Sequence, residues 1–212
     1  MSDKQVLILG IGNLLWADEG FGIRVVETLN ERYTFPDNVE LMDGGTQGIY
    51  LVQHVQQADV LVVFDAIDYG LEPGTMKLIY GDQVPKFMGA KKMSLHQTGF
   101  QEVLAMAEFT GDYPKHLMLI GVQPVELEDF GGSLREPVRK QVDIAITKAL
   151  EFLAPFGVEP QPRQQPLAED DQLAPSELQR QRYEQERPSE DDACRQGDYR
   201  FLNAAADSNK GS

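Results

Sequence analysis

Short runs of consecutive apolar residues alternate along the chain with segments whose apolar residues recur at helical spacing. The runs predict strands buried on both faces, as in a parallel sheet, over 6–9, 39–42, 60–64 and 117–122, with an edge strand over 74–80. The helical spacing covers 20–33, 49–55, 98–109 and 138–152, and Thr98 is the expected N-cap of the third helix. Because strands alternate with helices, the pattern predicts right-handed crossovers and a doubly wound, three-layer α/β/α fold.

This pattern stops near Pro160. The last 52 residues, 161–212, contain no Val, Ile or Met, and their larger apolar residues are scattered. Such a segment buries too little apolar area to offset its chain entropy. We therefore predict one domain over residues 1–160 and a polar, disordered or loosely attached tail over 161–212, with a short helix over 176–186.

Charge and cysteine content narrow the classes of function. The chain has 34 acidic and 19 basic residues, for a net charge of −15, which argues against nucleic acid and anionic membranes as partners. The single cysteine, Cys194, excludes an intrachain disulfide and a cysteine-based zinc site. No run approaches the ~20 apolar residues of a membrane helix, and the N-terminus lacks a secretory signal pattern. We expect a cytoplasmic protein without membrane insertion.

A glycine-rich segment follows the first predicted strand. Its Gly-x-Gly start suggests a dinucleotide-binding fold, but Leu15 stands where the third glycine of that fingerprint would be. Asp18 and Glu19 lie at the start of the next helix, where they would repel a pyrophosphate. A nucleotide-binding module is therefore a weak alternative. Complementing the helix dipole accounts for Asp18, whereas Glu19 is placed for close approach by a ligand.

Polar residues also follow the second and third predicted strands. The segment Asp43-Gly44-Gly45-Thr46 fits either an ordinary strand-to-helix turn or a functional loop, since its glycines permit a tight backbone turn. Asp65 follows five apolar residues, so it emerges at the rim of the sheet, where a carboxylate needs a partner or a cation. Taken alone, Asp65 is better explained as a capping or turn residue.

One histidine adds a third candidate ligand. Two others are expected on the surface, namely His54 and His116. His96 stands just ahead of the helix predicted from residue 98. Glu19, Asp65 and His96 thus all lie at strand ends or helix starts that can converge on one rim of the sheet. One imidazole and two carboxylates with open positions suit Ni²⁺ or Zn²⁺.

Taken in order, these segments closely resemble the nickel–iron hydrogenase maturation endopeptidases. The matching segments are Gly10–Leu15, Asp18–Gly22, Asp43–Thr46, Asp65-Ala66, His96-Gln97 and Val122–Pro124. The resemblance spans about residues 4–158. The segments 65–75 and 91–96 are similar to the branch that serves membrane-bound uptake hydrogenases.

The resemblance implies a twisted, mostly parallel five-stranded sheet between helices. It implies an endopeptidase, grouped with the aspartic proteases, that activates a hydrogenase by removing a C-terminal extension from its large-subunit precursor after nickel insertion. Glu19, Asp65 and His96 match the metal-contacting residues of the family, and the Asp43 loop is associated with cleavage. Nickel would arrive with the substrate, while Zn²⁺ or Cd²⁺ could replace it in the isolated protein. We expect this precursor as the partner and a monomer otherwise.

Two catalytic routes stay open at this point. Either the metal polarises the carbonyl and activates water, or Asp43 or Asp65 acts as general base on a water molecule. Covalent catalysis is not expected, because Cys194 lies in the polar tail. The alternative to a protease is a non-enzymatic nickel chaperone or sensor that uses the same three ligands.

Overall fold

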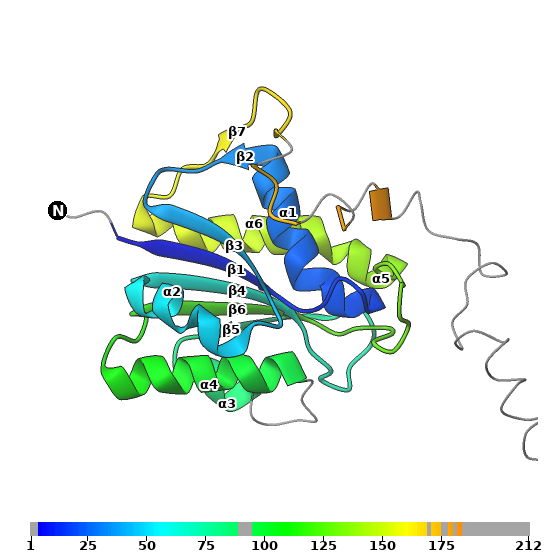
Figure 1. Ribbon diagram of the computed structural model, residues 1–212, viewed down its shortest axis with the longest axis horizontal. Helices are drawn as coiled ribbons and strands as arrows, with labels where there is room; N and C mark the ends of the chain where they lie inside the picture. The colour runs from blue at the N-terminus through cyan, green and yellow to red at the C-terminus, as the bar shows by residue number, and fades with distance from the viewer. Residues whose placement is uncertain (1–3, 89–94, 169–170, 175–177, 180–181, 184–212) are drawn as a thin grey trace, which may run out of the picture.

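A five-stranded sheet lies between two layers of helices in the computed structural model, which describes residues 4–88, 95–168, 171–174, 178–179 and 182–183 (Figure 1). The strand order is β3-β1-β4-β6-β5. Four strands run parallel, and β5 pairs with β6 in the antiparallel sense at the edge. The strands are β1 (Val6–Ile11), β3 (Val39–Gly45), β4 (Val60–Ala66), β5 (Met76–Tyr80) and β6 (His116–Val122). The predicted three-layer α/β/α fold with a mostly parallel sheet is confirmed.

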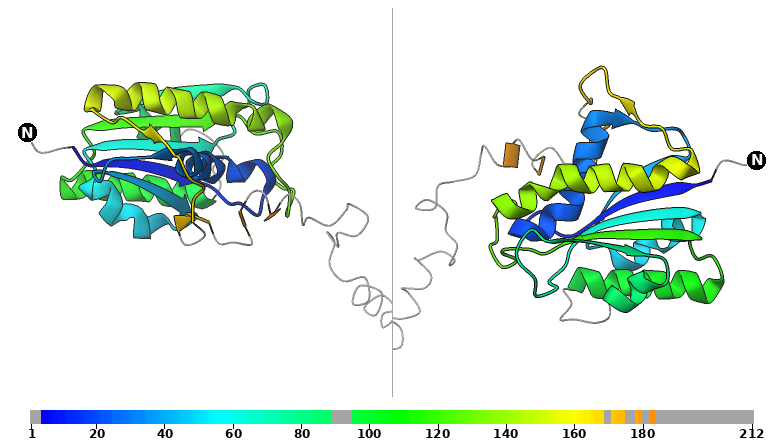
Figure 2. Two further views of the ribbon diagram at one scale, coloured as in Figure 1. Left: turned by 90° about the horizontal axis from the view of Figure 1, so that it is seen from above. Right: turned by 180° about the vertical axis from the view of Figure 1, so that it is seen from behind.

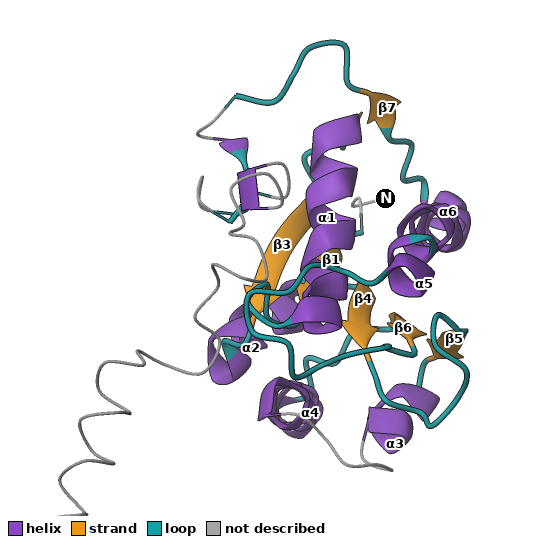
Figure 3. Cartoon of the chain, turned by 90° about the vertical axis from the view of Figure 1, so that its right-hand side faces the viewer, coloured by secondary structure: helices purple, strands orange, loops and turns teal. Residues whose placement is uncertain are grey.

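The helices divide between the two faces of the sheet, as Figures 2 and 3 show. One face is covered by α1 (Phe21–Arg32), α5 (Glu136–Arg139) and α6 (Gln141–Leu153). The other is covered by α2 (Val52–Gln57), α3 (Gln83–Met88) and α4 (Leu95–Thr110). Short 3-10 helices are η1 (Ala17–Gly20), η2 (Gly48–Leu51) and η3 (Ala154–Phe156). Among the described residues, no helix is long and apolar enough to cross a membrane.

Three predicted helix boundaries are wrong. The helix expected over 49–55 consists of the 3-10 helix η2 followed by α2, which begins at Val52 and ends at Gln57. The helix expected from Thr98 begins at Leu95, so Thr98 lies inside α4 and is not its N-cap. A capping residue is a weak signal, and Leu95 and Gln97 before it are favourable helix formers that extend the helix. The final helix begins at Glu136, two residues earlier than predicted, because Pro137 fits the first turn of a helix, and it consists of α5 and α6. The helix expected over 176–186 lies mostly outside the described residues.

Glycines allow the backbone of α1 to lie directly on the sheet. A Cβ atom on Gly22 would overlap the carbonyl oxygens of Ile11 and Phe64 and would lie 2.8 Å from the nitrogen of Ile11. A Cβ atom on Gly10 would lie 2.7 Å from the carbonyl carbon of Gly22. The start of α1 is therefore seated on β1 and β4 with no side chain between the backbones.

The described parts of the tail contact the domain. The short strand β7 (Gln161–Pro162) pairs with β2 (Tyr33–Thr34) in the antiparallel sense. The Arg163 side chain donates hydrogen bonds to the carbonyl oxygens of Asn30 and Tyr33, at 3.0 and 3.2 Å. These contacts attach the beginning of the tail to α1 and β2. The loose attachment expected for 161–212 as a whole stays a prediction.

The substitution Gly22→Ala is expected to destabilise the fold by roughly 3 kcal/mol, because overpacking against fixed backbone atoms cannot be relieved by a side-chain rotation. Urea unfolding measures the difference. The matched control is Gly20→Ala, whose Cβ atom would lie 3.3 Å from the end of the Leu14 side chain and needs only a small adjustment. Equal stability of the two variants would show that the backbone contact is not needed.

Candidate active site

The candidate residues gather where the parallel strands end. At this edge of the sheet, Gly10 of β1 pairs with Asp43 of β3 on one side and with Phe64 of β4 on the other. Asp65 follows Phe64 directly. The two acidic residues therefore lie on either side of the end of β1. Ligands of open α/β sheets bind in the crevice just outside this edge.

Asp43 and Asp65 nevertheless belong to opposite faces of the sheet. Successive residues of a strand alternate between faces. Leu41 packs in the core under α1, which puts Asp43 on the α1 face, whereas Val63 packs in the core under α4, which puts Asp65 on the α4 face. With β1 between them, their backbones are about 10 Å apart, as two inter-strand spacings require. The two acids thus belong to opposite faces of the sheet at the same edge.

Asp65 is fully buried, with 0% of its surface exposed. It pairs across the sheet with Gly121, over which the Tyr69 ring is stacked, since a Cβ atom on Gly121 would lie 3.0 Å from the Tyr69 Cζ. Burial raises the pKa of the Tyr69 hydroxyl, and the charge of Asp65 raises it further. The tyrosine therefore stays protonated beside the carboxylate.

The loop after β4 is held in place by Gln123. The side-chain oxygen of Gln123 accepts hydrogen bonds from the backbone amides of Tyr69 and Leu71, at 2.7 and 3.1 Å. Its side-chain amide donates to Asp68 Oδ1 at 3.0 Å. This buried glutamine fixes the path of the chain that leaves Asp65. In the sequence, Gln123 stood out only as part of a family motif.

Glu19 lies in η1, on the end of β1. Its carbonyl oxygen accepts a hydrogen bond from the Asn13 amide at 3.2 Å and occupies the space that a Gly12 side chain would need. Gly12 has a φ of 140°, which favours glycine. The space above Gly12, where a pyrophosphate would lie in a dinucleotide-binding fold, is therefore filled by protein backbone.

The neighbouring Asp18 is a buried anchor. With 0% exposure, its carboxylate accepts hydrogen bonds from the backbone amides of Val125, Glu126 and Arg135, at 2.8, 3.0 and 2.7 Å. It thereby ties η1 to the loop after β6. Sequence reasoning assigned Asp18 to the helix dipole, because residues more than 100 positions away cannot be paired with it by local pattern. Ala17 beside it has a φ of 32°, the one positive value among described residues other than glycine.

The backbone of His96 lies in the first turn of α4, while its side chain is outside the described part of the structure. This end of α4 packs at the carboxyl edge, since a Cβ atom on Gly99 would lie 3.3 Å from the Cα of Gly48 in η2. Among the side chains that the structure describes, no three of His, Cys, Asp or Glu form a group able to hold a metal ion. The expected cluster of Glu19, Asp65 and His96 stays a prediction.

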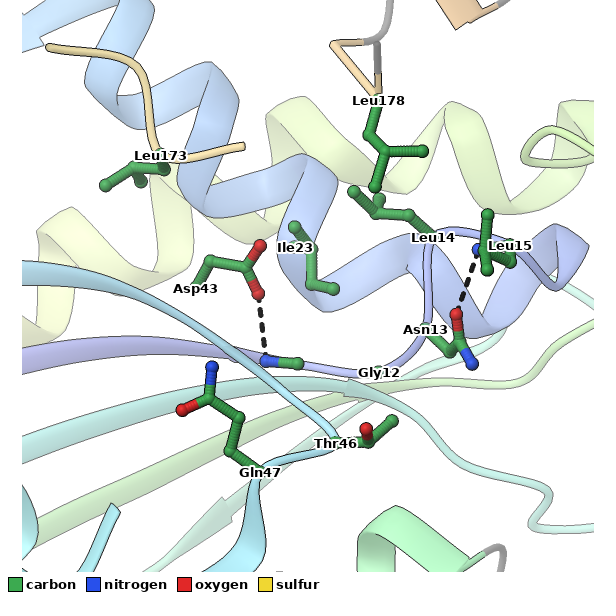
Figure 4. Close-up of a pocket in the computed structure, with 11 residues that line it drawn as sticks. Gly12, Asn13, Leu14, Leu15, Ile23, Asp43, Thr46, Gln47, Leu173 and Leu178 are labelled. Atoms are coloured by element: carbon green, nitrogen blue, oxygen red, sulfur yellow. Dashed lines mark hydrogen bonds between the residues drawn. The ribbon is translucent and has the colours of Figure 1, made fainter. Parts of the chain in front are cut away.

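Asp43 lines a groove of about 490 Å³ on the α1 side of the sheet (Figure 4). One wall is apolar and the other is polar. The lining residues are Gly12, Asn13, Leu14, Leu15, Ile23, Asp43, Gly45, Thr46, Gln47, Leu173 and Leu178. Such a groove suits an extended peptide, which has polar backbone groups and side chains of both kinds.

The Asp43 carboxyl has a pKa above its usual value. Burial is the main cause, and it outweighs the hydrogen bond that Asp43 Oδ1 accepts from the Gly45 amide at 2.8 Å and the attraction of Arg24, both of which lower the pKa. A raised pKa makes a carboxylate a stronger base. The loop Asp43–Thr46 therefore combines an exposed polar wall with a basic carboxylate.

Comparisons with known proteins agree with this arrangement. The hydrogenase maturation protease family matches residues 23–152. Hydrogenase expression/formation protein HupM of Azotobacter chroococcum is 68% identical over 201 residues, which are 95% of each chain. The hydrogenase 2 maturation protease of Escherichia coli is 41% identical over 161 residues, or 76% of this chain and 97% of the relative.

A solved structure shares the fold at similar identity. The hydrogenase maturating endopeptidase HybD from Escherichia coli superposes with a TM-score of 0.71 and 41% identity, covering 75% of this chain and 98% of HybD. The resemblance predicted from the motifs is confirmed, and so is the prediction of an endopeptidase rather than a nickel chaperone. The chain belongs to the hydrogenase maturation protease family.

Proposed function

We propose that this protease acts as a monomer in the cytoplasm and removes the C-terminal extension of a nickel–iron hydrogenase large-subunit precursor once nickel is in place. The observation that carries the proposal is Asp65. This fully buried carboxylate is the last residue but one of the apolar strand β4, at the edge to which η1 brings Glu19.

Glu19, Asp65 and His96 are the proposed contacts to the nickel carried by the substrate. Position 96 precedes Phe100 by one helical turn, and Phe100 packs in the same core cluster as Val63, two residues before Asp65. The first turn of α4 and the end of β4 therefore share one face of the sheet. Two carboxylates and an imidazole leave coordination positions open, which a nickel ion already held by the substrate can use.

If the protease recognises its substrate through nickel, only a precursor that already holds nickel is cleaved. The substrate's own ligands and the three protease side chains together complete the coordination shell, so an empty precursor loses this contact. Specificity then depends on the metal as well as on the peptide sequence.

Asp43 is the proposed general base. Its carboxylate takes a proton from water while the water oxygen attacks the scissile carbonyl carbon, and the proton passes to the departing amine as the peptide bond breaks. The backbones of Asp43 and Asp65 lie on either side of β1, so both acids are at the same edge of the sheet.

The decisive experiment incubates the full chain with nickel-loaded and nickel-free precursor and weighs the products. Loss of the extension only from the nickel-loaded precursor is the expected result. Unchanged mass of both precursors would overturn the proposal that this precursor is the substrate. Equal trimming of both would exclude nickel as the recognition element.

The substitution Asp65→Asn should lower the processing rate roughly 100-fold while the melting temperature stays near normal. Asparagine keeps the volume but lacks the charge that binds a metal. The control is Asp68→Asn, which retains the oxygen that accepts hydrogen bonds from Gly70 and Gln123 and should process the precursor at close to the normal rate. Full activity of Asp65→Asn would remove Asp65 from the site.

The substitution Asp43→Asn should lower kcat by about 100-fold or more, with binding of the precursor retained. It should also raise the melting temperature at pH 7–8. Because the folded-state pKa of Asp43 is raised, its ionisation costs stability above that pKa, and the cost vanishes as the pH falls through the ordinary value of about 3.9. Melting curves of both proteins from pH 8 to pH 4 check whether the difference shrinks. If the difference in melting temperature between the two proteins grew as the pH fell, the pKa of Asp43 would be lowered in the folded protein and not raised.

A further inference from the structure

The outer face of α1 carries a buried ion pair. Arg24 Nη1 lies 2.7 Å from Glu27 Oε2, and the two residues are only 6% and 8% exposed. Burial raises the pKa of Glu27, although Arg24 opposes the shift. Charged residues on the outside of a helix are normally solvated, so another segment must cover them.

That segment is part of the tail. Arg24 Nη1 also donates a hydrogen bond to the carbonyl oxygen of Leu178 at 2.8 Å, and the Tyr183 ring lies 5.6 Å from the guanidinium group. Ala174 is 5% exposed and packs with Leu14 and Ile23. The described residues 171–174 and 178–179 are thus seated on α1 by polar and apolar contacts together.

The seated segment forms one side of the Asp43 groove. Leu173 and Leu178 line the groove across from Thr46 and Gln47, as the close-up in Figure 4 shows. Leu178 also packs against the cluster formed by Leu14, Ile23 and Ala174. We name Leu173 and Leu178 the tail wall. Without it, the α1 side of the groove would be open toward solvent beyond Ile23.

Chain length among the relatives indicates that the tail wall is not common to all members of the family. The Escherichia coli hydrogenase 2 maturation protease is matched over 97% of its length, yet 51 residues of this chain have no counterpart in that match, about the length of the tail. HupM and the HoxM protein of Azotobacter vinelandii match over 201 and 202 residues, or 95% of this chain. The fold and the carboxyl-edge site therefore do not require the tail, which is available for another role.

We propose that the tail wall is a specificity element that receives an aliphatic side chain from the substrate's C-terminal extension. This inference rests on the proposed function, which brings that extension along the groove to Asp43. The apolar surface of Leu14, Ile23 and the tail wall takes the side chain, while Thr46 and Gln47 on the opposite side face the peptide backbone. A peptide with an aliphatic residue near the scissile bond is the occupant that this two-sided lining fits.

The test compares wild type with Leu178→Ser on nickel-loaded precursor. We expect KM to rise roughly fivefold, as for loss of one partly buried aliphatic contact, with kcat within about twofold, because the Leu178 side chain cannot transfer a proton or stabilise a charge. Leu173→Ser should act in the same direction. The matched control is Ile144→Ser, which changes an exposed aliphatic residue on α6 and should leave KM unchanged.

A double-mutant cycle identifies the partner residue. Each aliphatic residue of the substrate extension is replaced by Ser in turn and assayed with wild type and with Leu178→Ser. At one position, replacement by Ser should raise KM for the wild-type protease. The same replacement should have little further effect on KM for Leu178→Ser, since both changes remove the same contact. The proposal would be overturned if, at every substrate position, the KM effects of the Ser replacement and of Leu178→Ser simply multiplied. An unchanged KM for both leucine variants would also overturn it. Failure of wild type to process any precursor would instead refute the proposed function.

Discussion

Direct contact between the backbone of α1 and the backbones of β1 and β4 sets the geometry of the whole carboxyl edge. Gly10 and Gly22 meet without side chains between them, and any Cβ atom at Gly22 would overlap two carbonyl oxygens. Close-packed backbones leave no freedom for the helix to shift. The turn before α1 must then pass over Gly12, and this puts Glu19 at the end of β1. The position of one candidate ligand thus follows from glycines that carry no functional group.

Buried polar side chains fix the loops around that edge. Asp18 holds the loop after β6 through three backbone amides, and Gln123 holds the loop after β4 through two. Each would cost free energy if its partners were lost, because unsatisfied buried polar groups are expensive. The loops that carry the candidate site are therefore attached to the sheet at defined points, and the site is organised before a substrate arrives.

Because side chains alternate between the faces of a strand, the proposed nickel contact Asp65 and the proposed general base Asp43 lie on opposite faces of the sheet. Asp65 belongs to the α4 face, which the first turn of α4 with position 96 also covers, and Asp43 belongs to the α1 face, where the groove opens. A substrate that meets both must pass the end of β1, where the backbone of Glu19 covers Gly12. On the α1 face the tail narrows the groove, so the part of the chain with the least regular pattern lines the surface where a peptide is expected.

The sequence by itself determined the fold class, since four buried apolar runs with helical segments between them are compatible with few arrangements other than a doubly wound sheet. It also located Glu19, Asp43, Asp65 and His96 at strand ends or helix starts, because the carboxyl ends of parallel strands share one edge. Only the tertiary structure decided that Asp43 and Asp65 belong to different faces, since this depends on pairing register. It alone paired Asp18 with amides more than 100 residues away, and Arg24 with Leu178. Local pattern carries no information about such partners, because they come together only when the chain packs.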